Sequence, residues 1–350
     1  MRLSVLDQST IVSGRTPDEA VQETLALARH CEALGYDRYW LAEHHNSASQ
    51  ADASPEILIA AIAATTKRIR VGSAGIMLPH YSSLKVAEQF RMLEAIAPGR
   101  IDLGLGRAPG SDGRTAYALN PNAGAAADAF PAQVRDLLAW VSGERLVEGH
   151  PFRDVRAQPS GPNQPETWIL GSSDYGAQIA AHFGLPYCFA HFITDGQGAE
   201  EALELYRIRY QPSARHPTPH AAIAVWALAA DTTEEAARLL TSRALWRLGR
   251  DRGIYTALPT PEEAEGYPYT PAERDRIDRF RATALWGPGP ELLQRIEKLA
   301  ANLGVAEVAV LTTVADPVAR RRSYTLLAEA ARLVPADVAP AAEGSTARTP

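Results

Sequence analysis

Residues 69–105 begin with Ile-Arg-Val-Gly-Ser-Ala-Gly-Ile-Met (69–77), continue with Leu-Lys-Val-Ala-Glu-Gln-Phe-Arg-Met-Leu-Glu-Ala-Ile (84–96) and end with Ile-Asp-Leu-Gly-Leu (101–105). The outer two segments are short and apolar, which is typical of buried strands. The middle segment has apolar residues at helical spacing and a polar outer face, so it predicts an amphipathic helix. This order predicts a right-handed βαβ unit with parallel strands.

The same alternation continues along the whole chain. We expect strands at 3–7, 38–42, 69–77, 101–105, 167–170, 187–192, 222–230 and 305–312. We expect helices at 17–34, 55–66, 84–96, 125–141, 175–182, 199–210, 234–248, 291–302 and 317–333. An open nucleotide-binding sheet is disfavoured, because no glycine-rich phosphate turn follows the first strand. The sequence predicts an α/β fold, a TIM (β/α)8 barrel, as a single domain over residues 1–334.

Two stretches interrupt the alternation. Residues 250–284 form a long polar insertion between the seventh and eighth expected strands. Such an insertion is either an active-site lid or a static surface excursion, and the sequence leaves both open. Residues 335–350 are rich in Ala, Pro, Ser and Thr without an apolar period, so we expect a disordered tail.

Composition narrows the range of partners. The formal net charge is −6, and no basic stripe is present, so neither nucleic acid nor an anionic membrane surface is expected to bind. The start of the chain has no apolar stretch long enough for a signal peptide or a membrane span, so we expect a cytoplasmic protein. Cys31 and Cys188 lack both metal-ligand spacing and a disulfide framework, and we interpret them as buried thiols.

The second expected strand ends in Ala-Glu-His-His-Asn, which places His44 and His45 at the carboxyl rim where barrels hold their functional groups. Adjacent residues on an extended segment point to opposite sides, and no third histidine is nearby, so no metal site is expected. We interpret one histidine as an inward proton donor or acceptor and the other as packed. Two purely structural histidines are the alternative.

The third expected strand carries a run of small residues around Ala74 and Gly75. A glycine weakens a strand unless another group approaches closely, so this run predicts either a slot for a flat ligand or tight packing against a helix.

The fourth and fifth expected strands end in groups that suit an anion. The fourth departs from the Gly-x-Gly-x-x-Gly spacing because Pro109 occupies the third glycine position, which argues against a nicotinamide fold. Arg107, just past the strand, is placed to hold a phosphate. The fifth ends in Gly171-Ser172-Ser173 and runs into a helix, whose free N–H groups form either an anion site or a simple N-cap. Arg107 on the neighbouring strand favours a shared phosphate.

Five segments together resemble the luciferase-like flavin monooxygenases. They are Leu-Ala-Glu-His-His (41–45), Gly-Ile-Met-Leu-Pro (75–79), Pro-Gly-Arg-Ile-Asp-Leu-Gly-Leu-Gly-Arg-Ala-Pro-Gly-Ser-Asp (98–112), Leu-Gly-Ser-Ser (170–173) and Gly-Leu-Pro (184–186). The resemblance runs from the first strand to the helix near Leu333. It implies a (β/α)8 barrel that binds FMN, commonly as a homodimer, with reduced FMN supplied by a separate flavin reductase.

The resemblance also implies roles for particular residues. Arg107 and the turn of Gly171, Ser172 and Ser173 would contact the FMN phosphate. The flavin ring would lie against Ala74 and Gly75, where relatives have a cis peptide bond. His44 would transfer a proton near the flavin edge. His45 and Gly106 are expected to line the substrate space; luciferases have a reactive cysteine at the position of Gly106, which argues against light emission. His191, at the end of the sixth expected strand, either lines the same space or is a core histidine.

The implied reaction joins reduced FMN with O2 to give a flavin hydroperoxide, which oxygenates a small organic substrate such as a secondary metabolite or polyketide. Three alternatives remain open at this stage. They are hydride transfer with a reduced deazaflavin on the same fold, flavin binding without catalysis and, as the least favoured, a zinc hydrolase.

Overall fold

A computed structural model describes residues 1–334, and the tail expected to be disordered, 335–350, lies outside the described residues. Eight parallel strands form a closed ring, in which each strand pairs with the next and the last pairs with β1. They are β1 (Arg2–Asp7), β2 (Arg38–Leu41), β3 (Arg70–Met77), β4 (Ile101–Gly106), β5 (Glu166–Gly171), β6 (Tyr187–Phe189), β7 (Ala221–Ala230) and β9 (Glu307–Leu311). The predicted (β/α)8 barrel is confirmed.

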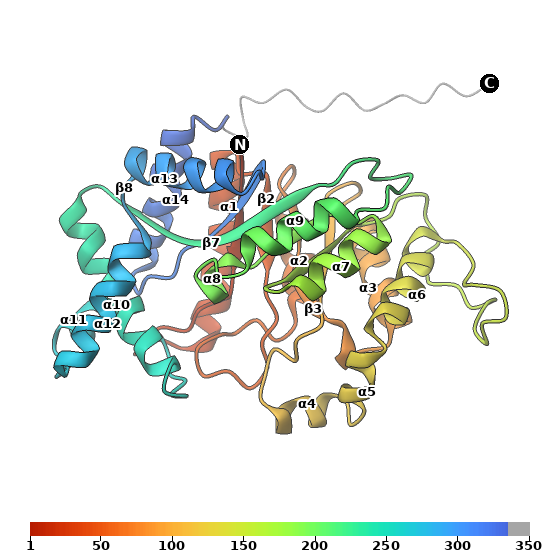
Figure 1. The fold of residues 1–350 in the computed structure, drawn as a ribbon, viewed down its shortest axis with the longest axis horizontal. Helices are drawn as coiled ribbons and strands as arrows, with labels where there is room; N and C mark the ends of the chain where they lie inside the picture. The colour runs from red at the N-terminus through yellow and green to blue at the C-terminus, as the bar shows by residue number, and fades with distance from the viewer. Residues whose placement is uncertain (335–350) are drawn as a thin grey trace.

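Long helices surround this ring (Figure 1). They are α1 (Pro17–Leu34), α2 (Pro55–Thr65), α3 (Ser83–Ile96), α6 (Phe130–Ser142), α7 (Asp174–Phe183), α9 (Ala199–Arg209), α10 (Thr233–Arg250), α13 (Gly289–Asn302) and α14 (Pro317–Ala331). The remaining helices are η1 (Leu78–His80), α4 (Gly113–Leu119), α5 (Ala123–Asp128), α8 (His191–Thr194), α11 (Pro261–Glu265) and α12 (Pro271–Thr283). α1 shows why they begin and end sharply: Thr16 and Glu19 form a capping box, and Gly35 takes the left-handed conformation.

Two expected elements differ from the structure. The helix expected at 125–141 is split into α5 and α6, because Pro131 lacks an N–H group and its ring excludes a continuous helix through that position. The sixth strand ends at Phe189 rather than at residue 192. Its pairing with β5 ends at Gly171, opposite Phe189, and the chain turns into α8 from His191.

The expected insertion between the seventh and eighth barrel strands contains α11, α12 and an extra strand, β8 (Leu285–Pro288). β7 (Ala221–Ala230) is long enough to pair with two strands, β8 and β9, along different parts of its length. Its residues 222–226 pair with β9 inside the ring, and its residues 227–230 pair with β8 outside it. The polar stretch is therefore an ordered extension built on the end of β7.

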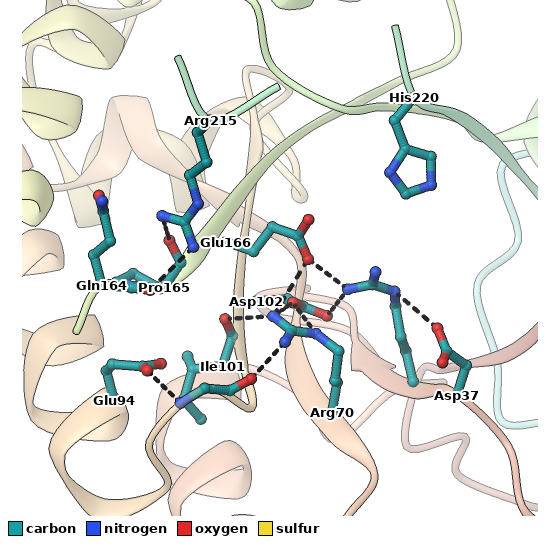
Figure 2. A network of polar contacts seen from close by, with 12 residues as sticks. Asp37, Arg70, Glu94, Ile101, Asp102, Gln164, Pro165, Glu166, Arg215 and His220 are labelled. Atoms are coloured by element: carbon teal, nitrogen blue, oxygen red, sulfur yellow. Dashed lines mark hydrogen bonds and ion pairs between the residues drawn. The ribbon is translucent and has the colours of Figure 1, made fainter. Parts of the chain in front are cut away.

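The amino ends of the strands are closed by a buried charge network, shown in part in Figure 2. Arg38 donates to Asp102 at 2.8 Å, to Glu166 at 2.9 Å and to Glu307 at 2.9 Å. Arg70 adds a second set of bonds to Asp102. Each carboxylate is thus matched by an arginine, which buried charges require.

Two tryptophans lie above this network inside the barrel. The rings of Trp40 and Trp168 meet edge to face with their centroids 5.0 Å apart, and Trp40 Nε1 donates to Asp102 at 2.9 Å. Together with the charge network they give the barrel a closed floor, so its interior opens only at the carboxyl ends of the strands.

Candidate active site

A cavity of about 440 Å³ opens at the carboxyl ends of the barrel strands. This volume lies within the range of small-molecule sites, and Trp40 forms part of its floor. Eight of the ten residues proposed from the sequence line it: His44, Ala74, Gly75, Gly106, Arg107, Gly171, Ser172 and Ser173. The structure thus brings together residues from the ends of β2, β3, β4 and β5.

His44 faces the cavity and is held by a buried carboxylate. Its Nδ1 lies 3.0 Å from Oδ2 and 3.2 Å from Oδ1 of Asp52, which has no exposed surface. Burial raises the pKa of Asp52, against the opposing effect of His44. An acceptor at Nδ1 favours the tautomer with the proton there, which leaves Nε2 for a cavity-side partner. Asp52 was missed from sequence because it lies in a loop eight residues away.

His45 points the other way and is not among the residues that line the cavity. Its Nε2 lies 2.8 Å from Oε1 of the buried Glu43, whose carboxylate also accepts from Tyr81 at 2.7 Å and from the backbone N–H of Met77 at 3.0 Å. The His45 backbone N–H donates to Gly110 at 3.1 Å. This group ties the loops after β2, β3 and β4 together, so His45 supports the cavity wall from outside.

The wall formed by β3 and β4 is made by small residues. The Ala74–Gly75 peptide bond is cis, as the family resemblance implied. A Cβ at Gly75 would lie 2.7 Å from the carbonyl oxygen of Gly104, so only glycine allows the two strands to approach this closely. A Cβ at Gly106 would lie 3.3 Å from the sulfur of Met77, a flexible side chain, so a cysteine there would require Met77 to move.

Arg107 and the start of α7 form a group of unused donors. Within residues 1–334 the Arg107 guanidinium makes no hydrogen bond or ion pair, and it lies 3.8 Å from the ring centroid of Tyr175. Ser173 is the N-cap residue of α7, yet its hydroxyl makes no capping bond, so the simple N-cap interpretation is not what the structure shows. Tyr187 fixes the turn by donating to the Ser173 carbonyl at 3.1 Å. An exposed arginine beside a free helix N-terminus fits a phosphate.

His191 was expected to line the substrate space, and the structure does not place it there. It is the first residue of α8, and its ring packs against Gly196, where a Cβ would lie 2.3 Å from Nε2. Phe192 and Ile193, its neighbours in sequence, line the cavity instead. Because the strand ends three residues earlier than expected, the helical turn redirects these side chains.

One wall was not anticipated from the sequence. α10 contributes four lining residues, Arg243, Trp246, Arg247 and Arg250, and the loop that follows adds Asp251 and Tyr255. The spacing i, i+3, i+4, i+7 places the four on one face of a helix, which is the signal that could have found them. Within residues 1–334 no group of three or more His, Cys, Asp or Glu side chains is arranged to hold a metal ion, and no helix has the length and apolar character needed to cross a membrane.

A (β/α)8 barrel with histidine, serine and arginine side chains gathered at the carboxyl ends of its strands has the arrangement of a barrel enzyme. A profile of the luciferase-like monooxygenases matches residues 1–307. A luciferase-like monooxygenase of Escherichia coli K12 is 38% identical over 324 residues, covering 92% of this chain and 95% of that protein. The chain belongs to the luciferase-like monooxygenase family, and it is an oxidoreductase.

Solved structures share the fold of this chain. The crystal structure of apo-MsnO8 is 37% identical, with a TM-score of 0.86, and the match covers 95% of this chain and 99% of that one. The oxygenating constituent of 3,6-diketocamphane monooxygenase from Pseudomonas putida, solved in complex with FMN, shares the fold at 19% identity and a TM-score of 0.70, covering 96% and 99%.

Proposed function

We propose that this protein is an FMN-dependent monooxygenase that uses reduced FMN and O2 to oxygenate a small organic substrate. The observation that carries the proposal is the free Arg107 guanidinium beside the uncapped start of α7, on the same cavity as the glycine-lined wall of β3 and β4. A phosphate held by Arg107, Ser172 and Ser173 would direct a flat ring system toward Ala74 and Gly75. FMN has both parts.

The chain's own residues would position the cofactor and handle the proton. When bound, reduced FMN supplies the electrons that activate O2. His44, oriented by Asp52, holds or delivers a proton through Nε2 at the cavity side. The aromatic and apolar walls, including Trp246 and Phe192, keep bulk water from the reacting atoms.

Reduced FMN would arrive from a separate flavin reductase. The loop after β4 lacks the glycine spacing of a nicotinamide site, and residues 1–334 form one barrel without a second nucleotide-binding sheet. The cavity is open at the strand ends, so a reduced cofactor made elsewhere can enter it. The homodimer and the cytoplasmic location expected from sequence stay predictions.

The decisive experiment measures reduced FMN affinity anaerobically for the wild-type protein and for Arg107→Ala and Ser172→Ala/Ser173→Ala. Loss of charge-assisted hydrogen bonds to a phosphate predicts about 10- to 100-fold weaker binding for Arg107→Ala, and a smaller loss for the serine pair. Riboflavin, which has no phosphate, should bind the wild type and Arg107→Ala equally. Arg114→Ala, on the exposed helix α4, is the matched control.

The proposal is contradicted if these substitutions leave the affinity for reduced FMN unchanged. A preference for a reduced deazaflavin over reduced FMN would favour hydride transfer instead. FMN affinity without oxygen-dependent product would indicate a non-catalytic flavin-binding protein. For the monooxygenase, mixing the reduced complex with O2 should give a transient absorbance distinct from both reduced and oxidised FMN.

A further inference from the structure

Arg243 lies in the middle of α10 and faces the cavity with only 5% of its surface exposed. Its Nη1 donates to Thr313 Oγ1 at 3.2 Å, whereas its Nε has no hydrogen-bond partner within residues 1–334. The guanidinium lies 4.7 Å from the ring centroid of Trp226 and 5.9 Å from that of Trp246. A hydroxyl and two indoles surround this cation, and none of them supplies a negative charge.

The neighbouring charges do not neutralise Arg243 either. Burial, together with the nearby charges of Arg247 and Arg250, lowers the pKa of Arg243 to about 9, so it is still cationic at neutral pH. The charge of Asp195 raises the pKa of Arg243. However, the Asp195 carboxylate already pairs with Arg247, whose Nη1 lies 2.6 Å from Asp195 Oδ1. Asp251, on the same wall, pairs with Arg276 at 2.5 Å.

A buried charge without a counter-ion is unfavourable, and in a cleft such a group is a candidate to bind a ligand that supplies the missing partner. Arg320 is a buried arginine of the same chain that does have a counter-ion. It is buried to a similar extent, but it pairs with Asp7 at 2.6 Å and so has a structural role. Arg243 has the burial of a structural arginine without the carboxylate.

Arg243 is also remote from the candidate phosphate site. Arg107 follows β4, whereas Arg243 contacts Trp226 on β7 and Thr313 just after β9. Around the closed ring β7 is three strands from β4 and β9 is four, so these residues lie on opposite sides of the barrel mouth. The cavity therefore has two separate places for a negative charge, with apolar residues such as Ala224 and Phe192 between them.

We infer that Arg243 binds the carboxylate of the substrate, and that the substrate class is an organic acid with an apolar body. The planar guanidinium matches a carboxylate, and the two indoles and the apolar wall suit a hydrocarbon chain. This inference rests on the proposed function, because it assigns the substrate class of the same site. It places the acid end of the substrate against α10, with the rest of the molecule extending toward the glycine-lined wall.

A matched pair of probes tests this inference without turnover. Octanoate and octanamide have the same length and differ in head-group charge, and calorimetry at neutral pH measures both, with and without bound FMN. Wild-type protein should bind octanoate about 10- to 100-fold more tightly than octanamide, the usual effect of a charge-assisted hydrogen bond. Arg243→Met should abolish this preference and leave octanamide within about threefold, and Arg243→Lys should retain part of it.

Arg238→Met is the control, because Arg238 lies on the same helix but is exposed and pairs with Glu262 and Glu265. The inference is overturned if wild-type protein shows no preference for octanoate. It is also overturned if Arg243→Met weakens both probes equally, which indicates a structural role, or weakens FMN as much as octanoate, which indicates a cofactor role. Failure of the proposed function would look different: FMN would not bind wild-type protein, while the octanoate preference would persist.

Discussion

His44 and Asp52 show how a buried residue orients a partly exposed one. Asp52 has no exposed surface, and its carboxylate lies 3.0 Å from His44 Nδ1, so the imidazole ring is held with its other nitrogen toward the cavity. The burial that raises the pKa of Asp52 also removes water as a competing partner for His44. A proton-transfer role for His44 therefore depends on two residues.

Replacing either residue should lower turnover with little effect on cofactor affinity. Loss of a positioned acid or base predicts a fall in kcat of about 10²- to 10⁴-fold for His44→Gln. Asp52→Asn should cost about 10-fold or more, because the amide can donate to Nδ1 and so favour the opposite tautomer. Steady-state kinetics and FMN titration measure both effects. If kcat is unchanged in His44→Gln, the role assigned to His44 is wrong.

At the scale of elements, the insertion at 250–284, which the sequence left open as a lid or a static excursion, has two parts with different positions. Arg250, Asp251 and Tyr255, at the start of the range 250–284, line the cavity. The helices α11 and α12 instead pack on α10, and Arg238, Arg252 and Arg276 form ion pairs across this contact. Trp246 holds the loop by donating to the Thr256 carbonyl at 2.9 Å. Within this insertion, therefore, the residues positioned to cover the cavity are those at its start, up to Tyr255.

Tyr255→Ala should open the cavity to water. The ring of Tyr255 lines the cavity from this loop, and its removal would let water reach the reacting atoms. We expect hydrogen peroxide released per product formed to rise roughly twofold or more, since water access favours unproductive oxygen consumption. Peroxide and product assays on the same sample measure this ratio. Tyr117→Ala, on an exposed residue of α4, should leave it unchanged, and an unchanged ratio in Tyr255→Ala would exclude a covering role.

At the scale of the whole molecule, the charge network at the amino ends joins six of the eight barrel strands. Glu307, the first residue of β9, lies 2.8 Å from Arg2 of β1, and its other oxygen bonds Arg38 of β2 at 2.9 Å. Asp102 and Glu166 extend the network to β4 and β5. The floor of the cavity is thus held by contacts between residues that are far apart in the chain.

This network makes stability depend on acid pH. Burial raises the pKa of Glu307, but His220, 3.3 Å away, and the charges of Arg38 and Arg2 outweigh it and bring the pKa to about 2. A lowered pKa means that the contribution to stability is complete above the ordinary value near 4.5 and is lost as the pH falls toward 2. Denaturant unfolding of wild-type protein should show this loss.

Glu307→Gln should be less stable by about 3 kcal/mol at neutral pH, because the buried Arg38 loses one of the carboxylates that balance its charge. Its stability should also vary less with pH between 4.5 and 2 than that of the wild type. Glu297→Gln, at an exposed position of α13, should have the same stability as the wild type at neutral pH and over the acid range. Parallel pH curves for wild type and Glu307→Gln would show that the network does not control acid stability.

The positions of most strands and helices, the barrel, and the site residues at the ends of β2 to β5 followed from the sequence. Apolar periodicity reports burial, and the carboxyl ends of parallel strands must meet at one face, so Arg107, His44 and the Ser172–Ser173 turn could be grouped from their positions in the chain. The family motifs added the cis bond at Ala74–Gly75. These features are local, because each depends on residues close together in the chain.

Only the tertiary structure decided which side chains face the cavity and which partners they lack. His45 and His191 have the right residue type but turn to Glu43 and Gly196, while Asp52 reaches His44 from a separate loop. The missing counter-ion of Arg243 depends on what β7, α10 and the loop after β9 bring together. Charge and burial at a site arise from contacts between distant segments, and sequence spacing alone does not determine them.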